Sequence, residues 1–259
     1  MKGIILYFSG TGNTKFIANK IAEEFYKNGC EIDTYSIEEK IDLKNVSYDY
    51  LILGFPKYFE YIPKFFIEYL EDNLSDTSKE IKTMIFSTGR DRAKTYFNEL
   101  EKKLLTKNYR VIVTKNFQMP DNYTLSKGYK KLTRKDYKEI FDSSLVEIKD
   151  AVVNFLMDNY MKENVNEIKA SIYKTINKMK TKDLYKNSVK YSVNSDCDKC
   201  NLCVKICPTK NIDNIGGDIK FRDNCIMCCR CVNACPKNSI MYNEKEHYQY
   251  KENIDLIVG

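Results

Sequence analysis

The strongest constraint on this chain is a pair of matching cysteine runs near its C-terminal end. The run CDKCNLCVKICPTKNI at 197–212 and the run CIMCCRCVNACPKNSI at 225–240 align at an offset of 28 residues. Each run reads C-x2-C-x2-C-x3-C-P. Such self-similarity indicates that one small structural unit is repeated. Nine of the ten cysteines lie between 197 and 235, and in a reducing compartment this clustering indicates metal ligation rather than disulfides.

The spacing within each run suits a four-iron cubane. Three thiolates from one tight loop can hold three irons, while the fourth cysteine points away and ligates the other cluster. The sequence therefore predicts two [4Fe-4S] clusters with crossed ligation and a small domain that folds around its metals. The first predicted ligand set is Cys197, Cys200, Cys203 and Cys235. The second predicted set is Cys225, Cys228, Cys231 and Cys207.

Zinc is the alternative for clustered cysteines, but a zinc ribbon uses four cysteines per metal at a wider gap. Two complete runs with prolines do not fit that pattern. Cys229 lies between two predicted ligands and cannot point the same way as either, so we expect it not to bind metal. Cys30 is expected to be a small buried side chain at the start of a strand. The single histidine, His247, lies in a polar tail, which predicts a surface position and argues against histidine-based catalysis.

The stretch FSGTGNTKF at 8–16 has the composition of a phosphate-binding loop. It follows an apolar run and precedes a helical pattern. It matches neither the P-loop, which needs Gly and Lys adjacent, nor the dinucleotide fingerprint, whose third glycine would fall on Lys15. Its hydroxyls, glycines and helix N-terminus can still hold a terminal phosphomonoester. The alternative is a capped turn in some other α/β protein.

Strands and helices alternate in the first part of the chain, which predicts an α/β, doubly wound, right-handed parallel sheet. The strands are expected near 2–8, 31–36, 49–54, 82–87 and 110–116. The helices are expected near 14–27, 62–73, 91–106 and 136–158. The expected strand order is 2-1-3-4-5, with a ligand at the carboxyl ends of the first and third strands.

Four stretches carry a resemblance to a known family. SGTGNT resembles the FMN phosphate loop of flavodoxins, and GFPKYFEYIPKFF at 54–66 and IFSTGRD at 85–91 resemble their two loops around the isoalloxazine ring. FQMPDNY at 117–123 resembles a loop of the flavodoxin–ferredoxin fusion proteins of anaerobes, often called ferrodoxins. With the cysteine runs, the resemblance covers nearly the whole chain. It implies a flavodoxin-like domain followed by a small α+β two-cluster ferredoxin-like domain.

The resemblance also implies FMN as a cofactor. The implied phosphate-binding residues are Ser9, Thr11, Gly12, Asn13 and Thr14. The implied ring-bordering residues are Pro56, Lys57, Tyr58 and Phe59 on one loop and Ser87, Thr88, Gly89 and Arg90 on the other. Met119, Pro120, Asn122 and Tyr123 match the fusion family's loop and would cover the flavin edge.

Two features depart from common flavodoxins. The chain has no tryptophan, so Tyr58 or Phe59 would have to supply the aromatic stack. The ring loops contain Lys57 and Arg90, and positive charge near the flavin N1 would favour the anionic reduced flavin and raise its potential. The alternative is that both are solvated surface cations.

The predicted organisation is an FMN-binding domain at 1–160, a helical connector at 161–190, a 2[4Fe-4S] domain at 191–243 and a tail at 244–259. The long loop 118–134 is expected to be functional or to cover a ligand. In the connector, a thin apolar stripe at helical spacing is expected to pack against the rest of the chain. The alternative is that the stripe binds a partner. The stripe is Ile168, Ile172, Ile176 and Met179.

The 259 residues carry a formal net charge of +6. Two clusters and an FMN phosphate, each about −2, would bring the loaded protein near neutrality, so we expect no nucleic-acid partner. The N-terminal apolar run is too short for a signal peptide, and no stretch approaches the roughly 18 apolar residues of a membrane span. We therefore expect a cytoplasmic protein. The sequence gives no oligomeric state.

Three functions fit these observations. The first is an electron-transfer protein that passes electrons between two clusters and FMN and exchanges them with ferredoxin-type redox partners. The second is an FMN-dependent reductase of a small molecule, although no acid–base pair is visible in the sequence. The third is a ferredoxin-like carrier whose first domain is a flavin-free docking module.

Overall fold

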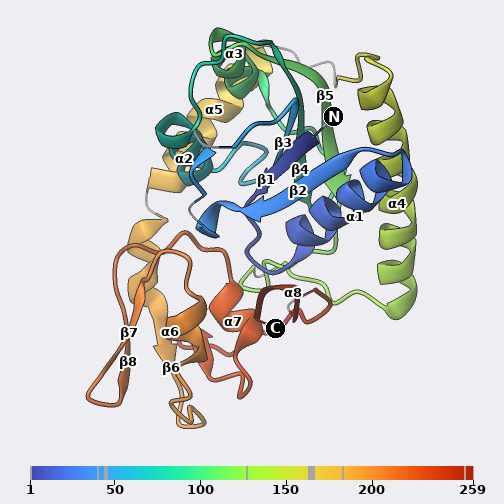
Figure 1. Cartoon of the computed structure of the whole chain (residues 1–259). Coiled ribbons are helices and arrows are strands. Elements are labelled where there is room, and N and C mark those ends of the chain that lie inside the picture. The colour runs from blue at the N-terminus through green and yellow to red at the C-terminus, as the bar shows by residue number, and fades with distance from the viewer. Residues whose placement is uncertain are drawn as a thin grey trace. The chain divides into compact units, whose positions relative to one another are not determined.

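The computed structural model describes residues 2–39, 41–43, 46–126, 128–162, 167–182, 184–253 and 255–258 (Figure 1). The chain divides into two compact units. Unit 1 comprises Met1–Ser9, Asn13–Pro120 and Leu132–Asn177. Unit 2 comprises Gly10–Gly12, Asp121–Lys131 and Lys178–Gly259. The domain boundaries expected from the sequence remain a prediction.

Unit 1 is built on a five-stranded parallel sheet in the order β2-β1-β3-β4-β5. This confirms the predicted order and the doubly wound α/β class. Because parallel strands are buried on both faces, they read as nearly continuous apolar runs. The strands are β1 (Lys2–Tyr7), β2 (Glu31–Ser36), β3 (Tyr50–Pro56), β4 (Ile81–Gly89) and β5 (Tyr109–Gln118).

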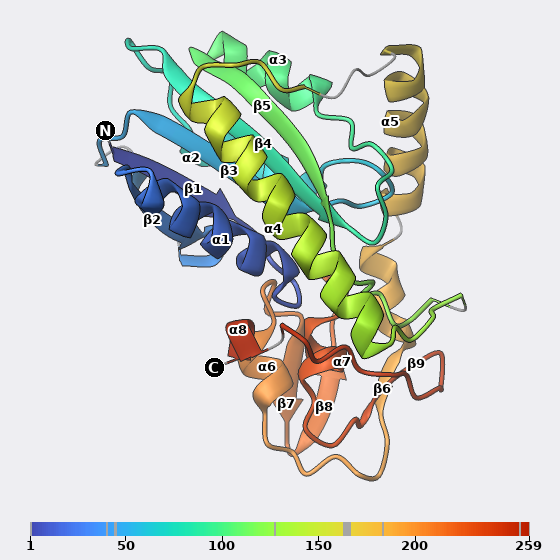
Figure 2. The ribbon, with the colours of Figure 1, turned by 90° about the vertical axis from the view of Figure 1, so that its right-hand side faces the viewer.

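Helices cover both faces of this sheet. Figure 2 shows α1 (Asn13–Lys27) and α4 (Arg134–Leu156) together on the near face, with α2 (Lys64–Asn73) and α3 (Asn98–Thr106) on the other. Under α1 and α4, Phe25 stacks on Tyr50 with ring centroids 5.1 Å apart. A short 3-10 turn, η1 (Ile37–Glu39), follows β2.

One predicted helix boundary is wrong. A helix was expected from residue 91, but α3 begins at Asn98. The carboxylate of Asp91 accepts a hydrogen bond from the Ala93 N–H, and this turn competes with helix formation. By contrast, α4 begins two residues earlier than predicted, because Thr133 and Asp136 form a reciprocal capping box.

The connector contains α5 (Glu167–Lys182). Its apolar stripe does not pack as predicted, because three of its four residues are exposed and only Ile176 is half-buried. Tyr173 stacks on Tyr96 at 4.9 Å, and the Asn177 side-chain amide donates to the Tyr58 carbonyl at 2.6 Å. The exposed stripe residues are Ile168, Ile172 and Met179, at 73%, 53% and 69% exposure.

Unit 2 contains two antiparallel strand pairs, β6 with β9 and β7 with β8. The internal repeat is visible in its backbone. The short helices α6 and α7 are each preceded by a left-handed residue at the same repeat position, Asn201 (φ 63°) and Cys229 (φ 58°). The elements are η3 (Tyr185–Lys190), β6 (Tyr191–Val193), α6 (Leu202–Ile206), β7 (Ile212–Ile215), β8 (Asp218–Phe221), α7 (Arg230–Ala234), β9 (Ile240–Tyr242) and α8 (Asp255–Val258).

Among the helices of the described residues, none has both the length and the apolar character needed to cross a membrane.

Candidate functional site

The loops after β1, β3 and β4 begin at the carboxyl edge of the sheet, where open α/β sheets bind ligands. The strand register brings their starting points together: Tyr7 of β1 lies opposite Gly54, and Pro56 of β3 lies opposite Thr88 of β4. The residues predicted to border a flavin ring lie at the carboxyl ends of β3 and β4 or directly after them. Their grouping is therefore a consequence of the sheet order.

The start of α1 is tied to β4 through a pair of buried hydroxyls. Thr14 Oγ1 and Thr88 Oγ1 lie 2.8 Å apart in a hydrogen bond. The Asn13 side-chain amide donates to the Pro120 carbonyl at 3.0 Å, so the loop after β5 joins the same edge. The predicted phosphate-binding side chains are all buried: Ser9, Thr11, Asn13 and Thr14.

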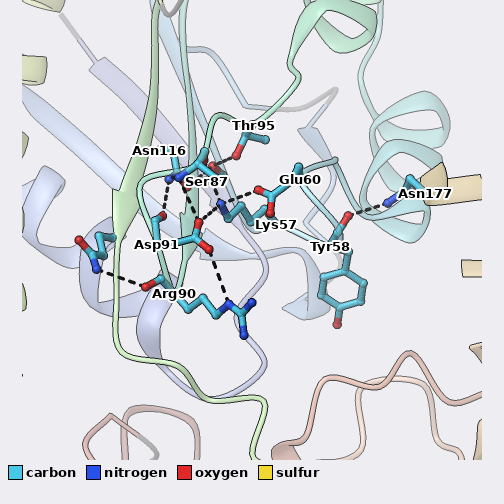
Figure 3. A network of polar contacts seen from close by, with 11 residues as sticks. Lys57, Tyr58, Glu60, Ser87, Arg90, Asp91, Thr95, Asn116 and Asn177 are labelled. Atoms are coloured by element: carbon cyan, nitrogen blue, oxygen red, sulfur yellow. Dashed lines mark hydrogen bonds and ion pairs between the residues drawn. The ribbon is translucent and has the colours of Figure 1, made fainter. Parts of the chain in front are cut away.

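Lys57 lies at the centre of a polar network that joins the loops after β3 and β4 (Figure 3). Its ammonium is 2.6 Å from Glu60 Oε2, 2.7 Å from Asp91 Oδ1 and 2.9 Å from the Ala93 carbonyl. The side chain is only 5% exposed. Lys57 is therefore no solvated surface cation, and its charge is already balanced by carboxylates.

The loop after β3 turns back sharply between Tyr58 and Tyr61, whose backbones exchange two hydrogen bonds of 2.9 and 3.0 Å. The two residues between them, Phe59 and Glu60, have φ of 49° and 62°. Left-handed conformations at both central positions are those of a type I′ turn, which favours Asn and Gly. Neither residue suits this conformation, so the turn is strained.

A second polar group supports the loop after β4. Ser87 Oγ lies 2.7 Å from Thr95 Oγ1 and donates to Asn116 Oδ1 at 3.0 Å. The Asn116 amide in turn donates to the carbonyls of Asp91 and Ala93 at 3.0 and 3.2 Å. Ser87, predicted to border the ring, thus also braces the turn that carries Asp91 (Figure 3).

Other predicted flavin residues lie in unit 2, within Gly10–Gly12 and Asp121–Lys131. Thr11 accepts a hydrogen bond from the Asn122 side chain. The Asn122 carbonyl accepts from Asn233 at 3.2 Å. Tyr123 is 40% exposed, and burial of its hydroxyl end raises the pKa of its phenol above the ordinary range.

The cysteines of unit 2 surround two separate cavities. Of the predicted ligands, each cavity takes three from one run and the fourth from the other, which is the arrangement that crossed ligation needs; Cys229 also lines the first cavity. The four predicted ligands at the first cavity are Cys207, Cys225, Cys228 and Cys231. The four at the second are Cys197, Cys200, Cys203 and Cys235. Within the described residues, no three His, Cys, Asp or Glu side chains converge to hold a single metal ion.

Comparison with protein families matches each part of the chain to a known domain. A family described as "Flavodoxin domain" matches residues 4–126, and one described as "4Fe-4S dicluster domain" matches residues 152–251. The chain combines a flavodoxin domain with a 4Fe-4S dicluster domain. A search of curated proteins found no match to this sequence.

Several solved structures are similar to the flavodoxin domain. The two-electron reduced flavodoxin of Megasphaera elsdenii is 23% identical, covers 56% of this chain and 98% of its own, and has a TM-score of 0.41. Oxidised flavodoxin 2 of Bacillus cereus is 15% identical over 61% of this chain and 99% of its own, with a TM-score of 0.42. Rubredoxin oxygen:oxidoreductase of Desulfovibrio gigas is 17% identical over 60% of this chain and 37% of its own, with a TM-score of 0.37.

Burial changes the acidity of several thiols in the dicluster domain. It raises the pKa of Cys203 to about 11 and that of Cys225 to about 12. Burial and the neighbouring Cys228 raise the pKa of Cys231 well above its ordinary value. Because iron binds the thiolate, ligation by these residues would have to release their protons.

Three residues outside the predicted ligand sets have defined places. Cys229 is fully buried, and its thiol contacts the Met227 carbonyl at 3.6 Å. Cys30, predicted to be buried, is half-buried immediately before β2. His247 is also half-buried rather than on the surface. Its ring nitrogens lie 3.2 and 3.1 Å from the carbonyls of Thr124 and Tyr242.

Sequence analysis missed four residues that support the flavodoxin-domain loops: Glu60, Asp91, Thr95 and Asn116. A weak signal existed for Glu60, since it follows Lys57 by three residues and has the opposite charge. Asp91, Thr95 and Asn116 come close to these loops only because the strands pair in the sheet, and no local sequence pattern indicates them.

Acid should weaken the Lys57 network. Burial alone would raise the pKa of Asp91, but hydrogen bonds from Lys57 and the Ala93 N–H outweigh it and hold the pKa below its ordinary value. A carboxylate with a depressed folded-state pKa adds stability above its unfolded pKa of about 3.9, and this is lost as the pH falls through the folded pKa. We expect Asp91→Asn to lower the melting temperature at pH 7, with the difference from wild type shrinking below about pH 4. A pH-independent difference would contradict this.

Proposed function

We propose that this chain is an electron-transfer flavo-iron–sulfur protein that passes electrons between two [4Fe-4S] clusters and FMN. The observation that carries the proposal is the grouping of the eight predicted ligand cysteines around two cavities, with crossed contributions from the two runs. A flavin accepts one or two electrons, and each cluster accepts one. A chain that holds both kinds of group can therefore connect one-electron carriers with two-electron carriers.

The donor sets suit these groups. Eight thiols in two sets of four match the ligands of two cubanes. For FMN, the phosphate would be held by Ser9, Asn13, Thr14 and the first N–H groups of α1, a 15-residue helix whose N-terminus favours anions. The ring would lie against the loops after β3 and β4. When bound, FMN and the clusters supply the redox chemistry, and the chain supplies ligation, positioning and exclusion of water.

The proposed partners are redox proteins of the ferredoxin type, which could either donate electrons to this protein or accept electrons from it. The position of the loops at β3 and β4 also supports the individual ring-bordering residues proposed there, with Lys57 as the exception. Lys57 is enclosed by oxygens, so of the two predicted ring-side cations only Arg90, 61% exposed and 3.6 Å from Asp91, keeps a solvent-facing charge. The expected rise in flavin potential therefore has weaker support than it had from sequence.

Cofactor analysis tests the proposal. The protein is purified without oxygen, iron and sulfide are measured per chain, and flavin is released by heat. About eight irons and one FMN per chain are expected. About eight irons without flavin, even after incubation with FMN, would favour the ferredoxin-like carrier with a flavin-free domain. Turnover of an added small-molecule acceptor at the flavin would favour the reductase.

A further inference from the structure

We propose that Lys57 is a positioning residue: it does not act as a cation on the flavin, but clamps the loop after β3 to the loop after β4 in the conformation that receives the ring. This inference rests on the proposed function of the flavodoxin domain. It gives a different role to a residue for which the family resemblance implied a place beside the flavin ring.

The first support is the completeness of the ammonium's surroundings. Lys57 Nζ donates hydrogen bonds to Asp91 Oδ1 and the Ala93 carbonyl, and it forms an ion pair with Glu60 Oε2, with all three oxygens within 2.9 Å. With the side chain 5% exposed, no further ligand is needed to satisfy it. The carboxylates come from different loops, Glu60 from the first and Asp91 from the second. One cation therefore joins both.

The second support is the strained turn that the clamp holds. Phe59 and Glu60 are both left-handed, and this conformation persists only where the surroundings fix it. Glu60 is fixed twice: its carboxylate contacts Lys57, and its carbonyl accepts a hydrogen bond from the Tyr96 N–H at 3.1 Å. Removing the Lys57 charge would leave a half-buried carboxylate unpaired on this turn. The turn would then relax.

The third support is the path of the Lys57 side chain. A Cβ at Gly89 would lie 2.1 Å from Lys57 Cε, so the absence of a side chain at Gly89 allows the lysine to cross between the loops. The Lys57 N–H also donates to the Thr88 carbonyl at 2.9 Å, which continues the β3–β4 pairing up to the clamp. Gly89 thus makes room for the lysine, whereas the resemblance implied that it borders the ring.

Binding of FMN to the full-length apoprotein tests the clamp, with quenching of flavin fluorescence as the signal. We expect Lys57→Met to weaken FMN binding about tenfold or more, and Lys57→Arg, which keeps the charge and can contact both carboxylates, to recover part of the loss. Gly89→Ala should mimic Lys57→Met, because it displaces the lysine without removing its charge. Wild-type affinity in Lys57→Met, or no recovery in Lys57→Arg, would overturn the inference.

Lys79→Met is the matched control. Lys79 pairs with Asp49 at 2.7 Å before β4 begins, at the opposite end of the sheet from the loops. Its loss removes a lysine–aspartate pair without touching the clamp, so FMN affinity should stay at the wild-type value.

Hydrogen exchange without FMN separates this inference from the proposed function. In Lys57→Met, the amides of Tyr58, Tyr61 and Tyr96 should exchange at least about tenfold faster than in wild type, while amides inside β3 keep their rates. If wild type binds no FMN, the proposed function fails, but the exchange rates still test the clamp. Unchanged exchange at these three amides would overturn the clamp whether or not FMN binds.

Discussion

Cys207→Ala and Cys225→Ala should lose the same cluster, although the two cysteines belong to different runs. Cys207 follows α6 of the first repeat, yet it lines the cavity formed by the cysteines of the second run. Alanine offers no oxygen to replace the thiolate. We expect each variant to fall from about eight irons per chain to about four, with identical electron paramagnetic resonance spectra from the remaining cluster.

The opposite cavity gives the complementary pair. Cys203→Ala and Cys235→Ala should lose the other cluster and share a second residual spectrum, because Cys235 of the second run lines the cavity of the first. If ligation followed the runs instead, Cys207→Ala would resemble Cys203→Ala. That grouping of spectra would refute the crossed arrangement.

Symmetry between the repeats supports the equivalence of the two fourth cysteines. Cys207 accepts a hydrogen bond from the Asn211 N–H at 3.2 Å, and Cys235 accepts one from the Ser239 N–H at 3.3 Å. These pairs occupy corresponding repeat positions, so both sulfurs are held in the same way. Each fourth cysteine is thus oriented by its own run while it lines the other run's cavity.

Cys229→Ala is the matched control for this series. Cys229 lines the first cavity beside four predicted ligands and is more buried than they are, but it occupies the left-handed position that Asn201 fills in the first repeat. Since Asn201 is not a cysteine, that backbone position is not needed for ligation. The variant should keep both clusters, and any loss should be of stability alone.

The sequence predicted the sheet correctly because each of its strands carries its own signal. An apolar run followed by an amphipathic helix identifies a parallel strand unit locally, and the handedness rule then restricts the order of the strands. The repeat of the dicluster domain was equally visible in the sequence, because the cysteine spacing directly predicts the ligand-bearing loop.

The wrong helix start arose where a distant residue takes part in fixing the conformation. The helix expected from residue 91 starts at Asn98 because Asp91 binds Ala93 and Lys57 instead of continuing a helix. The resemblance implied that the same lysine borders the flavin ring, and it gave no sign of the pairing with Asp91, which lies 34 residues away in sequence. Periodicity and composition carry no information on such pairs; only the strand register brings them together.

Thr14→Val should weaken FMN binding roughly tenfold to a hundredfold. Valine has nearly the shape of threonine, so the change removes the hydroxyl and little else. In the proposed site that hydroxyl is a donor to the phosphate, and a hydrogen bond to a charged group contributes roughly 1.5–3 kcal/mol. The measurement is the dissociation constant of FMN for the full-length apoprotein.

Thr83→Val controls for the loss of a buried hydroxyl as such. Thr83 is fully buried on β4, and its hydroxyl donates to the Ile81 carbonyl at 3.1 Å, near the start of the strand. Both variants lose one buried hydrogen bond, because Thr14 also gives up its contact with Thr88. Both should therefore be destabilised by about 1 kcal/mol, but only Thr14→Val should lose flavin affinity.

The comparison decides between two uses of the same loop. If the hydroxyl of Thr14 serves only to tie α1 to β4, the two variants will bind FMN equally well, and the phosphate must be held by other groups. If neither they nor wild type bind FMN, the 2.8 Å contact between Thr14 and Thr88 is a structural link in a flavin-free domain, and electrons would enter and leave through the clusters alone. A selective loss in Thr14→Val would assign the loop to the phosphate.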